Sequence, residues 1–286
     1  MHHPKNYLFL LLTKKHIKQF AIFYCGCFLL CYAWFAYHGL LYSSVNPVFF
    51  LNRLDITHNL FMVTGLQYYL LQNSWLRICF DLLYFLLPLC LVYSVIKNKK
   101  IQPLLAIVTV IFNIVYNSFF STMSFVSVEN FTAWMIVPLV FYARTPKGFY
   151  YIMHICRLLF IIIFFSAALW KIRAGGLFNV EEMSAILFKQ HASYLVIENS
   201  GWYSQFISYL INHHILSYCL YLFAFIAEFI FVIGVFTKKM DKYLIISFCL
   251  FALVDYLLMG INYFTWLPFM GCFYFSKYQI QDTLQH

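Results

Sequence analysis

Long, nearly uninterrupted apolar stretches recur along this 286-residue chain and constrain its fold more than any other feature. Hydrophobic residues make up 63% of the sequence and charged residues 10%, whereas a soluble domain is about 45–50% apolar and about 25% charged. A soluble fold of this size cannot bury so much apolar surface. The composition therefore excludes soluble enzymes, disordered proteins and nucleic-acid-binding modules, and it predicts an integral membrane protein.

An α-helix needs about 20 mostly apolar residues to cross a bilayer. Eight stretches fit this requirement, so we predict an all-α membrane protein in which residues 1–286 form one multipass domain. The apolar run near the start of the chain is too short for a cleaved signal, so the first long span is expected to be retained. The last span is short for a full crossing. The predicted spans are 19–42, 75–96, 103–122, 125–143, 149–170, 215–236, 243–261 and 262–276.

Basic residues form short clusters between alternate apolar stretches. If both termini lie in the cytoplasm, 13 of the 19 lysines and arginines lie on the cytoplasmic side, five lie outside and Arg157 lies within a span. Positive charge gathers on the cytoplasmic side of multipass proteins. The sequence therefore predicts a protein of the cytoplasmic membrane with both termini inside the cell.

Two segments on the predicted outer side, 43–74 and 172–214, are long enough to form helices of their own. The first contains an apolar run of about 12 residues, which is short for a crossing and favours a re-entrant or interfacial helix. In the second, Asn179 can cap a helix that has Glu182 at its third position. Another amphipathic stretch begins at Trp202. We expect both helices of the second segment to lie along the outer membrane surface.

Four charged residues lie within predicted spans and have candidate partners there. Arg157 and Glu228 each lie roughly 13 Å from the cytoplasmic end of their helix, at about 1.5 Å per residue, so we predict that they pair. Alternatively, Arg157 reaches toward the cytoplasm and Glu228 finds another donor. Arg77 precedes Asp81 by four residues, a favourable helical spacing, and predicts a second structural pair.

Lys171 and Asp255 are the candidate catalytic residues. Asp255 has no basic neighbour in its own helical turn, so it finds a partner across the bundle or stays protonated and able to donate a proton. Lys171 follows Trp170 at the outer end of its span. It is either an interfacial lysine of the kind common at helix ends or a lysine in an outward-facing cavity that acts as a base.

The sequence contains no motif for a metal or a nucleotide. The nine cysteines all lie in apolar stretches and include no C-x-x-C pair, so we interpret them as small apolar side chains between helices. His213 and His214 are adjacent and would diverge by about 100° on a helix, which disfavours a shared metal. We predict no metal site, and the residues themselves identify no cofactor.

The second half of the chain resembles a known membrane module. The stretch FFSAALWKI at 164–172 is similar to the aromatic–small–small–x–x–Lys–aliphatic segment of the HTTM domain. That module is shared by vitamin-K-dependent γ-carboxylases, their bacterial relatives and SdpB-like proteins. The resemblance continues through Glu228 and the FTKK turn at 236–239 to GINYF at 260–264. It covers roughly residues 150–275.

The resemblance implies a functional role for Lys171. In the carboxylases the lysine at the matching position is the base that deprotonates reduced vitamin K. This chain departs from them at 251–255, where it lacks their histidine, and we expect it to lack their large extramembrane domain as well. It looks more like the SdpB-like branch, which is implicated in maturation or export of a secreted antimicrobial peptide. A quinone or lipid ligand is implied only by the resemblance.

Three functional hypotheses follow. The leading one is a bacterial HTTM-type membrane protein that acts in maturation or export of a secreted peptide, or on a lipid-phase substrate at the outer leaflet. The second is a non-enzymatic subunit that docks a partner membrane protein through its outer helices. A small-molecule transporter is a weaker alternative, because the spans lack the paired, glycine- or proline-broken helices of such proteins. The bilayer is the expected partner in every case, and nucleic acid in none.

Overall fold

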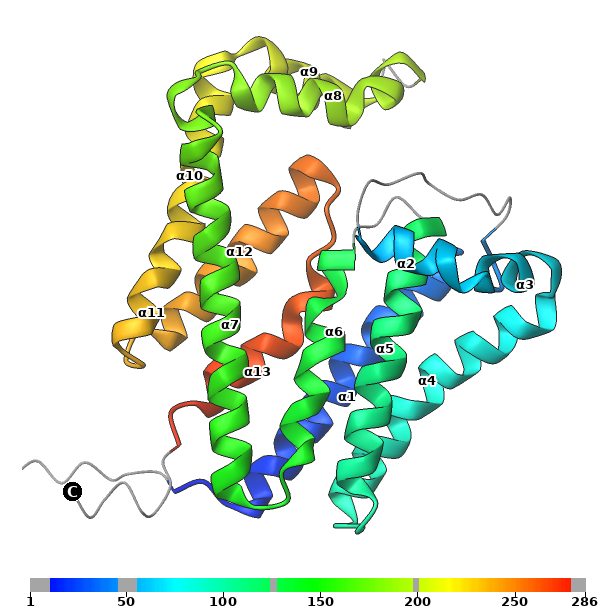
Figure 1. Ribbon diagram of the computed structural model, residues 1–286. Coiled ribbons are helices and arrows are strands. Elements are labelled where there is room, and N and C mark those ends of the chain that lie inside the picture. The colour runs from blue at the N-terminus through cyan, green and yellow to red at the C-terminus, as the bar shows by residue number, and fades with distance from the viewer. Residues whose placement is uncertain (1–10, 46–55, 124–127, 198–200, 279–286) are drawn as a thin grey trace, which may run out of the picture. The chain divides into compact units, whose positions relative to one another are not determined.

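The computed structural model describes residues 11–45, 56–123, 128–197 and 201–278, and the described residues form helices and turns with no β-strand (Figure 1). The chain divides into two compact units. Unit 1 comprises Met1–Cys156 and Phe264–His286, and unit 2 comprises Arg157–Tyr263. The all-α class predicted from the sequence is confirmed.

Six helices of the described chain are long and apolar enough to cross a membrane. Unit 1 holds three of them, and α7 passes from unit 1 into unit 2. In unit 2, α10 (His214–Phe229) continues through a short 3₁₀ turn, η4 (Ile230–Val232), into α11 (Ile233–Phe236) as one apolar helix. The other five are α1 (Lys14–Tyr37), α4 (Ser74–Ile96), α5 (Gln102–Met123), α7 (Pro146–Arg173) and α12 (Asp241–Met259).

The two remaining predicted spans are shorter in the structure. In place of 125–143 the chain forms a 3₁₀ turn, η1 (Val128–Phe131), then α6 (Thr132–Ile136) and a second 3₁₀ helix, η2 (Val137–Tyr142). In place of 262–276 it forms η5 (Phe264–Trp266) and α13 (Leu267–Phe275). Pro138 is the second residue of η2, and Pro268 is the second residue of α13. Proline has no backbone N–H, so it cannot donate the hydrogen bond that a helix interior requires.

Polar side chains of α5 compensate for the broken hydrogen bonding of α6 and η2. In a regular helix the carbonyl of Trp134 would accept the N–H of residue 138, which Pro138 lacks. Instead, the amide nitrogen of Asn113 donates to this carbonyl at 2.6 Å. At the far end of η2, the amide of Gln102 donates to the carbonyl of Phe141 at 2.8 Å. These contacts explain how irregular backbone can exist inside an apolar bundle.

We expect Asn113→Leu to destabilise the protein by about 1–3 kcal/mol, because it leaves the buried carbonyl of Trp134 without a donor. The measurement is thermal unfolding in detergent. Pro138→Ala supplies the missing N–H, so the double variant Asn113→Leu/Pro138→Ala should recover much of the loss. If Pro138→Ala gives no recovery in this background, the interpretation of Asn113 as a replacement donor is wrong.

In unit 1, the aromatic core forms around α1. Phe20, Tyr24 and Phe28 of this helix are buried, and the rings of Tyr24 and Phe28 lie 5.5 Å and 5.6 Å from that of Trp134. Two short helices, α2 (Ile56–Thr64) and α3 (Leu66–Gln72), precede α4. They occupy the place of the predicted re-entrant or interfacial helix.

In unit 2, the helices α7, α11 and α12 approach closely. A Cβ added at Gly234 of α11 would lie 2.8 Å from Cδ1 of Ile161 and 2.9 Å from Cδ1 of Leu244, so a larger residue there would have to displace the ends of these side chains. Phe160 of α7 packs against Phe231 and Phe248 at 5.3 Å between ring centroids. This packing turns one side of α7 toward α11 and α12, and the charged residues of α7 described below lie on that side.

A helical hairpin lies across one end of α10 in unit 2 (Figure 1). It consists of α8 (Glu182–Ile197) and α9 (Trp202–Asn212). Its buried apolar side packs on α10 and α12 through Met183, Leu187, Leu210, Tyr221 and Leu258. The hairpin corresponds to the two helices predicted in 172–214. The predicted cap differs in detail, because α8 begins at Glu182, which is therefore its first residue and not its third. Asn179 instead forms a turn before the helix: its side-chain oxygen accepts the N–H of Glu181 at 3.1 Å and its amide donates to Glu182.

Candidate functional site

Lys171 and Glu228 form a partly buried ion pair in unit 2. Lys171 lies in the last turn of α7, and its Nζ is 2.6 Å from Oε2 of Glu228 on α10. The side chain of Glu228 is 7% exposed and that of Lys171 is 22% exposed. The lysine is therefore an inward-facing partner of a buried acid, with part of its surface still accessible.

The predicted pairing of Arg157 with Glu228 is wrong. Arg157 instead pairs with Asp241, the first residue of α12: its Nε donates to Oδ2 at 2.8 Å, and its Nη2 donates to Oδ1. Nη2 also donates to the carbonyl of Gly234 at 2.8 Å. Glu228 has found another donor, Lys171, as in the alternative considered from the sequence.

The reason for the different pairing is the level at which the helices end. Equal distances from the cytoplasmic ends of two helices place two residues at one level only if those ends coincide. The contact between Arg157 and Gly234 shows that α11 ends beside Arg157, which is already eleven residues into α7. Glu228 therefore lies further along α7, within reach of Lys171.

Asp255 completes a cluster of three charged residues. It lies on α12, interacts electrostatically with both Lys171 and Glu228, and forms a side-chain hydrogen bond with Tyr263. The cluster therefore places one ammonium group near two carboxylic groups in a largely apolar unit. The cluster therefore contains three groups that can each hold or release a proton.

The aromatic ring of Tyr221 lies next to the ammonium group of Lys171. Its Nζ lies 5.7 Å from the centroid of the Tyr221 ring, which is within the range of a cation–π contact. A Cβ added at Gly176 would lie 2.5 Å from the hydroxyl of Tyr221. Glycine at 176 therefore lets the segment after α7 approach this ring.

The α8–α9 hairpin is hydrogen-bonded to the end of α12, close to the cluster. His191 donates through Nε2 to the carbonyl of Leu258 at 2.7 Å, and Tyr203 donates to that of Leu257 at 2.9 Å. Burial raises the pKa of Tyr203, which keeps its hydroxyl a donor. Gln190 donates to Met259 at 3.1 Å. The last turn of a helix leaves its carbonyls free, and these side chains satisfy three of them.

Arg77 and Asp81, predicted as a pair, both bind the turn after α1 in unit 1. Asp81 accepts the N–H groups of Tyr42 at 3.1 Å and Ser43 at 2.8 Å, and the hydroxyl of Tyr116 at 2.7 Å. Arg77 donates to the carbonyl of Tyr42 at 3.4 Å and to that of Val45 at 3.5 Å. Among the residues that the structure describes, Arg77 and Asp81 form no direct ion pair with each other. Their role in this turn is structural.

The described part of the chain contains no group of three histidine, cysteine or acidic side chains that could hold a metal ion. His213 contacts the carbonyl of Tyr209, whereas His214 contacts the hydroxyl of Ser184. The two adjacent histidines therefore have different partners.

No protein-family model, curated protein or solved structure matches this chain. The charged cluster of unit 2 is the part of the structure that bears most directly on function. The sequence identified Lys171 and Asp255 as the candidate catalytic residues, but Glu228 was expected to pair with Arg157 and not with Lys171. Sequence reasoning missed Asp241, whose signal is an acidic residue at a helix N-terminus, where the helix dipole favours negative charge.

Proposed function

We propose that this chain is a bacterial membrane protein of HTTM type that acts at the outer leaflet of the cytoplasmic membrane. Its substrate is a secreted peptide during maturation or export, or a lipid-phase molecule. The observation that carries the proposal is the cluster of Lys171, Glu228 and Asp255 within unit 2. Charged groups in an apolar bundle are costly, so a cluster of them indicates a functional site.

The proposed orientation uses the six long apolar helices together with the two shorter ones. Counting 132–142 and 264–275 as crossings gives eight, so that both termini lie on the same side. The basic turn residues Lys97, Lys99 and Lys100 then face the cytoplasm, and the α8–α9 hairpin lies outside. Lys171, at the end of α7 that leads toward this hairpin, is then near the outer leaflet.

The proposed chemistry is proton exchange with the substrate. A proton passes from the Lys171 ammonium to the Glu228 carboxylate across their 2.6 Å contact, which leaves a neutral amine and a carboxylic acid. The amine then accepts a proton from an acidic group of the substrate, and Glu228 or Asp255 returns the extra proton to solvent.

Labelling of an introduced cysteine tests the placement on which this proposal depends. Ser193 is an exposed residue of α8. With the native cysteines replaced, Ser193→Cys should react with an impermeant thiol reagent in whole cells, whereas Lys99→Cys should react only after lysis. The opposite pattern would overturn the orientation.

Docking of a partner protein is the second candidate function, and the α8–α9 hairpin favours it. Phe188 on α8 and Trp202 and Phe206 on α9 are exposed, at 59%, 79% and 42%. These side chains point away from the buried side of the hairpin and are available to a partner or to lipid headgroups.

A further inference from the structure

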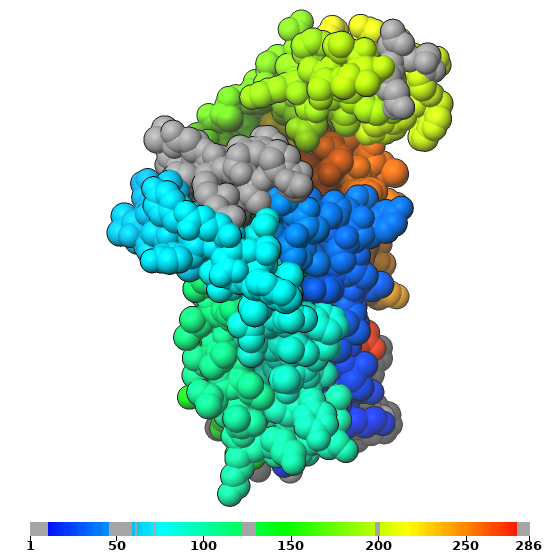
Figure 2. Space-filling view, turned by 90° about the vertical axis from the view of Figure 1, so that its right-hand side faces the viewer, coloured from blue at the N-terminus to red at the C-terminus, as the bar shows by residue number. Residues whose placement is uncertain are grey.

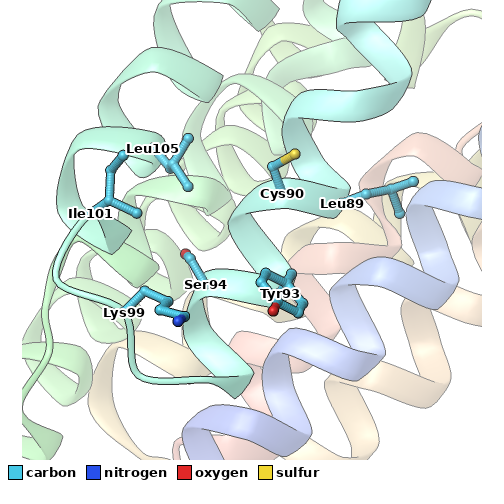
Figure 3. A pocket seen from close by; sticks show the side chains of 7 residues that line it. All are labelled: Leu89, Cys90, Tyr93, Ser94, Lys99, Ile101 and Leu105. Atoms are coloured by element: carbon cyan, nitrogen blue, oxygen red, sulfur yellow. The ribbon is translucent and has the colours of Figure 1, made fainter.

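A groove opens on the surface of unit 1, between the end of α4 and the start of α5. It has a volume of about 500 Å³, within the range of about 300–1,000 Å³ typical of small-molecule sites. Figure 3 shows Leu89, Cys90 and Tyr93 of α4 on one side and Ile101 and Leu105 on the other. Figure 2 shows that α4 and α5 form an outer face of this unit.

One lysine lies at the groove, and the turn between the helices holds it there. Asn98 adopts the left-handed conformation, with φ of 50°, and this reverses the chain after α4. The N–H of Lys99 then donates to the carbonyl of Ser94 at 2.9 Å, which closes the turn. The amide contact of Gln102 with Phe141 fixes the other side of the turn. Figure 3 shows the Lys99 side chain on the same side as Tyr93 and Ser94.

The turn that joins α4 and α5 is basic, and one of its lysines, Lys99, lines the groove. Lys97, Lys99 and Lys100 are exposed, and the ion pairs found among the described residues involve none of them. The interior offers little to a polar ligand, since the buried hydroxyl of Ser94 already donates to the carbonyl of Leu91 at 2.7 Å. An occupant therefore needs a long apolar part and a negative charge at one end.

We infer that the groove binds an anionic phospholipid, with an acyl chain between α4 and α5 and the phosphate at Lys99. Basic pockets between membrane helices bind anionic headgroups, and each nearby lysine contributes about 1 kcal/mol. An extended peptide fits less well, because the apolar walls would leave its backbone groups without partners. This inference requires the membrane placement proposed above but not the activity of the Lys171 cluster.

Native mass spectrometry of the purified full chain in detergent tests this site. Titration with dioleoyl phosphatidylglycerol should give tighter binding than titration with dioleoyl phosphatidylcholine. Lys99→Gln should weaken binding of phosphatidylglycerol about fivefold, the equivalent of about 1 kcal/mol. The matched control is Lys239→Gln, in the basic turn of unit 2, and it should leave this binding unchanged. Because Lys99 and Lys239 are both exposed, neither variant perturbs the core.

A groove-filling variant separates the acyl-chain contact from the headgroup contact. Leu105→Trp should reduce binding of both lipids while the protein still elutes as a single peak in size exclusion. Equal binding of the two lipids with no effect of Lys99→Gln would overturn the inference. A lipid-free dimer that Leu105→Trp dissociates would also overturn it, because the occupant would then be a second copy of the chain.

Discussion

Arg157→Leu should destabilise the protein by about 3–5 kcal/mol, the cost of leaving a buried charge without its partner. The substitution removes the guanidinium that donates twice to the carboxylate of Asp241, and it also removes the donor to the carbonyl of Gly234. The side chains of Arg157 and Asp241 are only 3% and 7% exposed, so water cannot replace these contacts. Thermal unfolding in detergent measures the loss.

Double substitutions identify the true partner of Arg157. Arg157→Leu/Asp241→Leu should recover much of the stability, whereas the losses of Arg157→Leu and Glu228→Leu should add. Arg173→Leu, at the exposed end of the same helix, controls for removal of an arginine and should have little effect. A coupling of Arg157 to Glu228 larger than its coupling to Asp241 would contradict the structure.

Lys171→Arg should abolish function while the protein folds and reaches the membrane in normal amounts. Arginine retains the positive charge beside Glu228, so the ion pair survives in part. It remains protonated at any accessible pH, whereas a lysine in an apolar site can release its proton. The measurement is complementation of a deletion strain, with protein amount checked by immunoblot.

The same substitution at another lysine serves as the control. Lys189 is exposed on α8 in the same unit, so Lys189→Arg should complement fully. If Lys171→Arg also complements fully at normal protein level, Lys171 is an anchor at the helix end and not a base.

The all-helical class and the long helices follow from the sequence because apolar length alone determines them. The breaks at Pro138 and Pro268 shortened two predicted spans. Proline in an apolar run is visible in the sequence, but its consequence depends on whether a neighbour supplies the lost hydrogen bond. The donor, Asn113, precedes the carbonyl that it satisfies by 21 residues and lies on another helix.

The sequence shows which charged residues need a partner within the membrane, but it does not show which residue that partner is. The sequence identifies Arg157, Lys171, Glu228 and Asp255 as costly residues that need partners. Their partners depend on how far each helix is shifted along its neighbour, and apolar runs leave that shift undetermined. The close approach of Ile161 and Leu244 to Gly234 accompanies this shift in unit 2. A glycine facing bulky apolar residues on two other helices is recognised only when the three helices are packed together.

Paired complementation by Lys171→Arg and Trp202→Ser tests the central claim most directly, because each variant removes the feature that supports one of the two candidate functions. Trp202 is exposed at the start of α9 and lies outside the charged cluster. If the cluster carries out proton exchange, Lys171→Arg fails to complement the deletion strain and Trp202→Ser complements it. Complementation by Lys171→Arg together with failure of Trp202→Ser, both at normal protein level, would contradict the account and identify the hairpin as a docking surface.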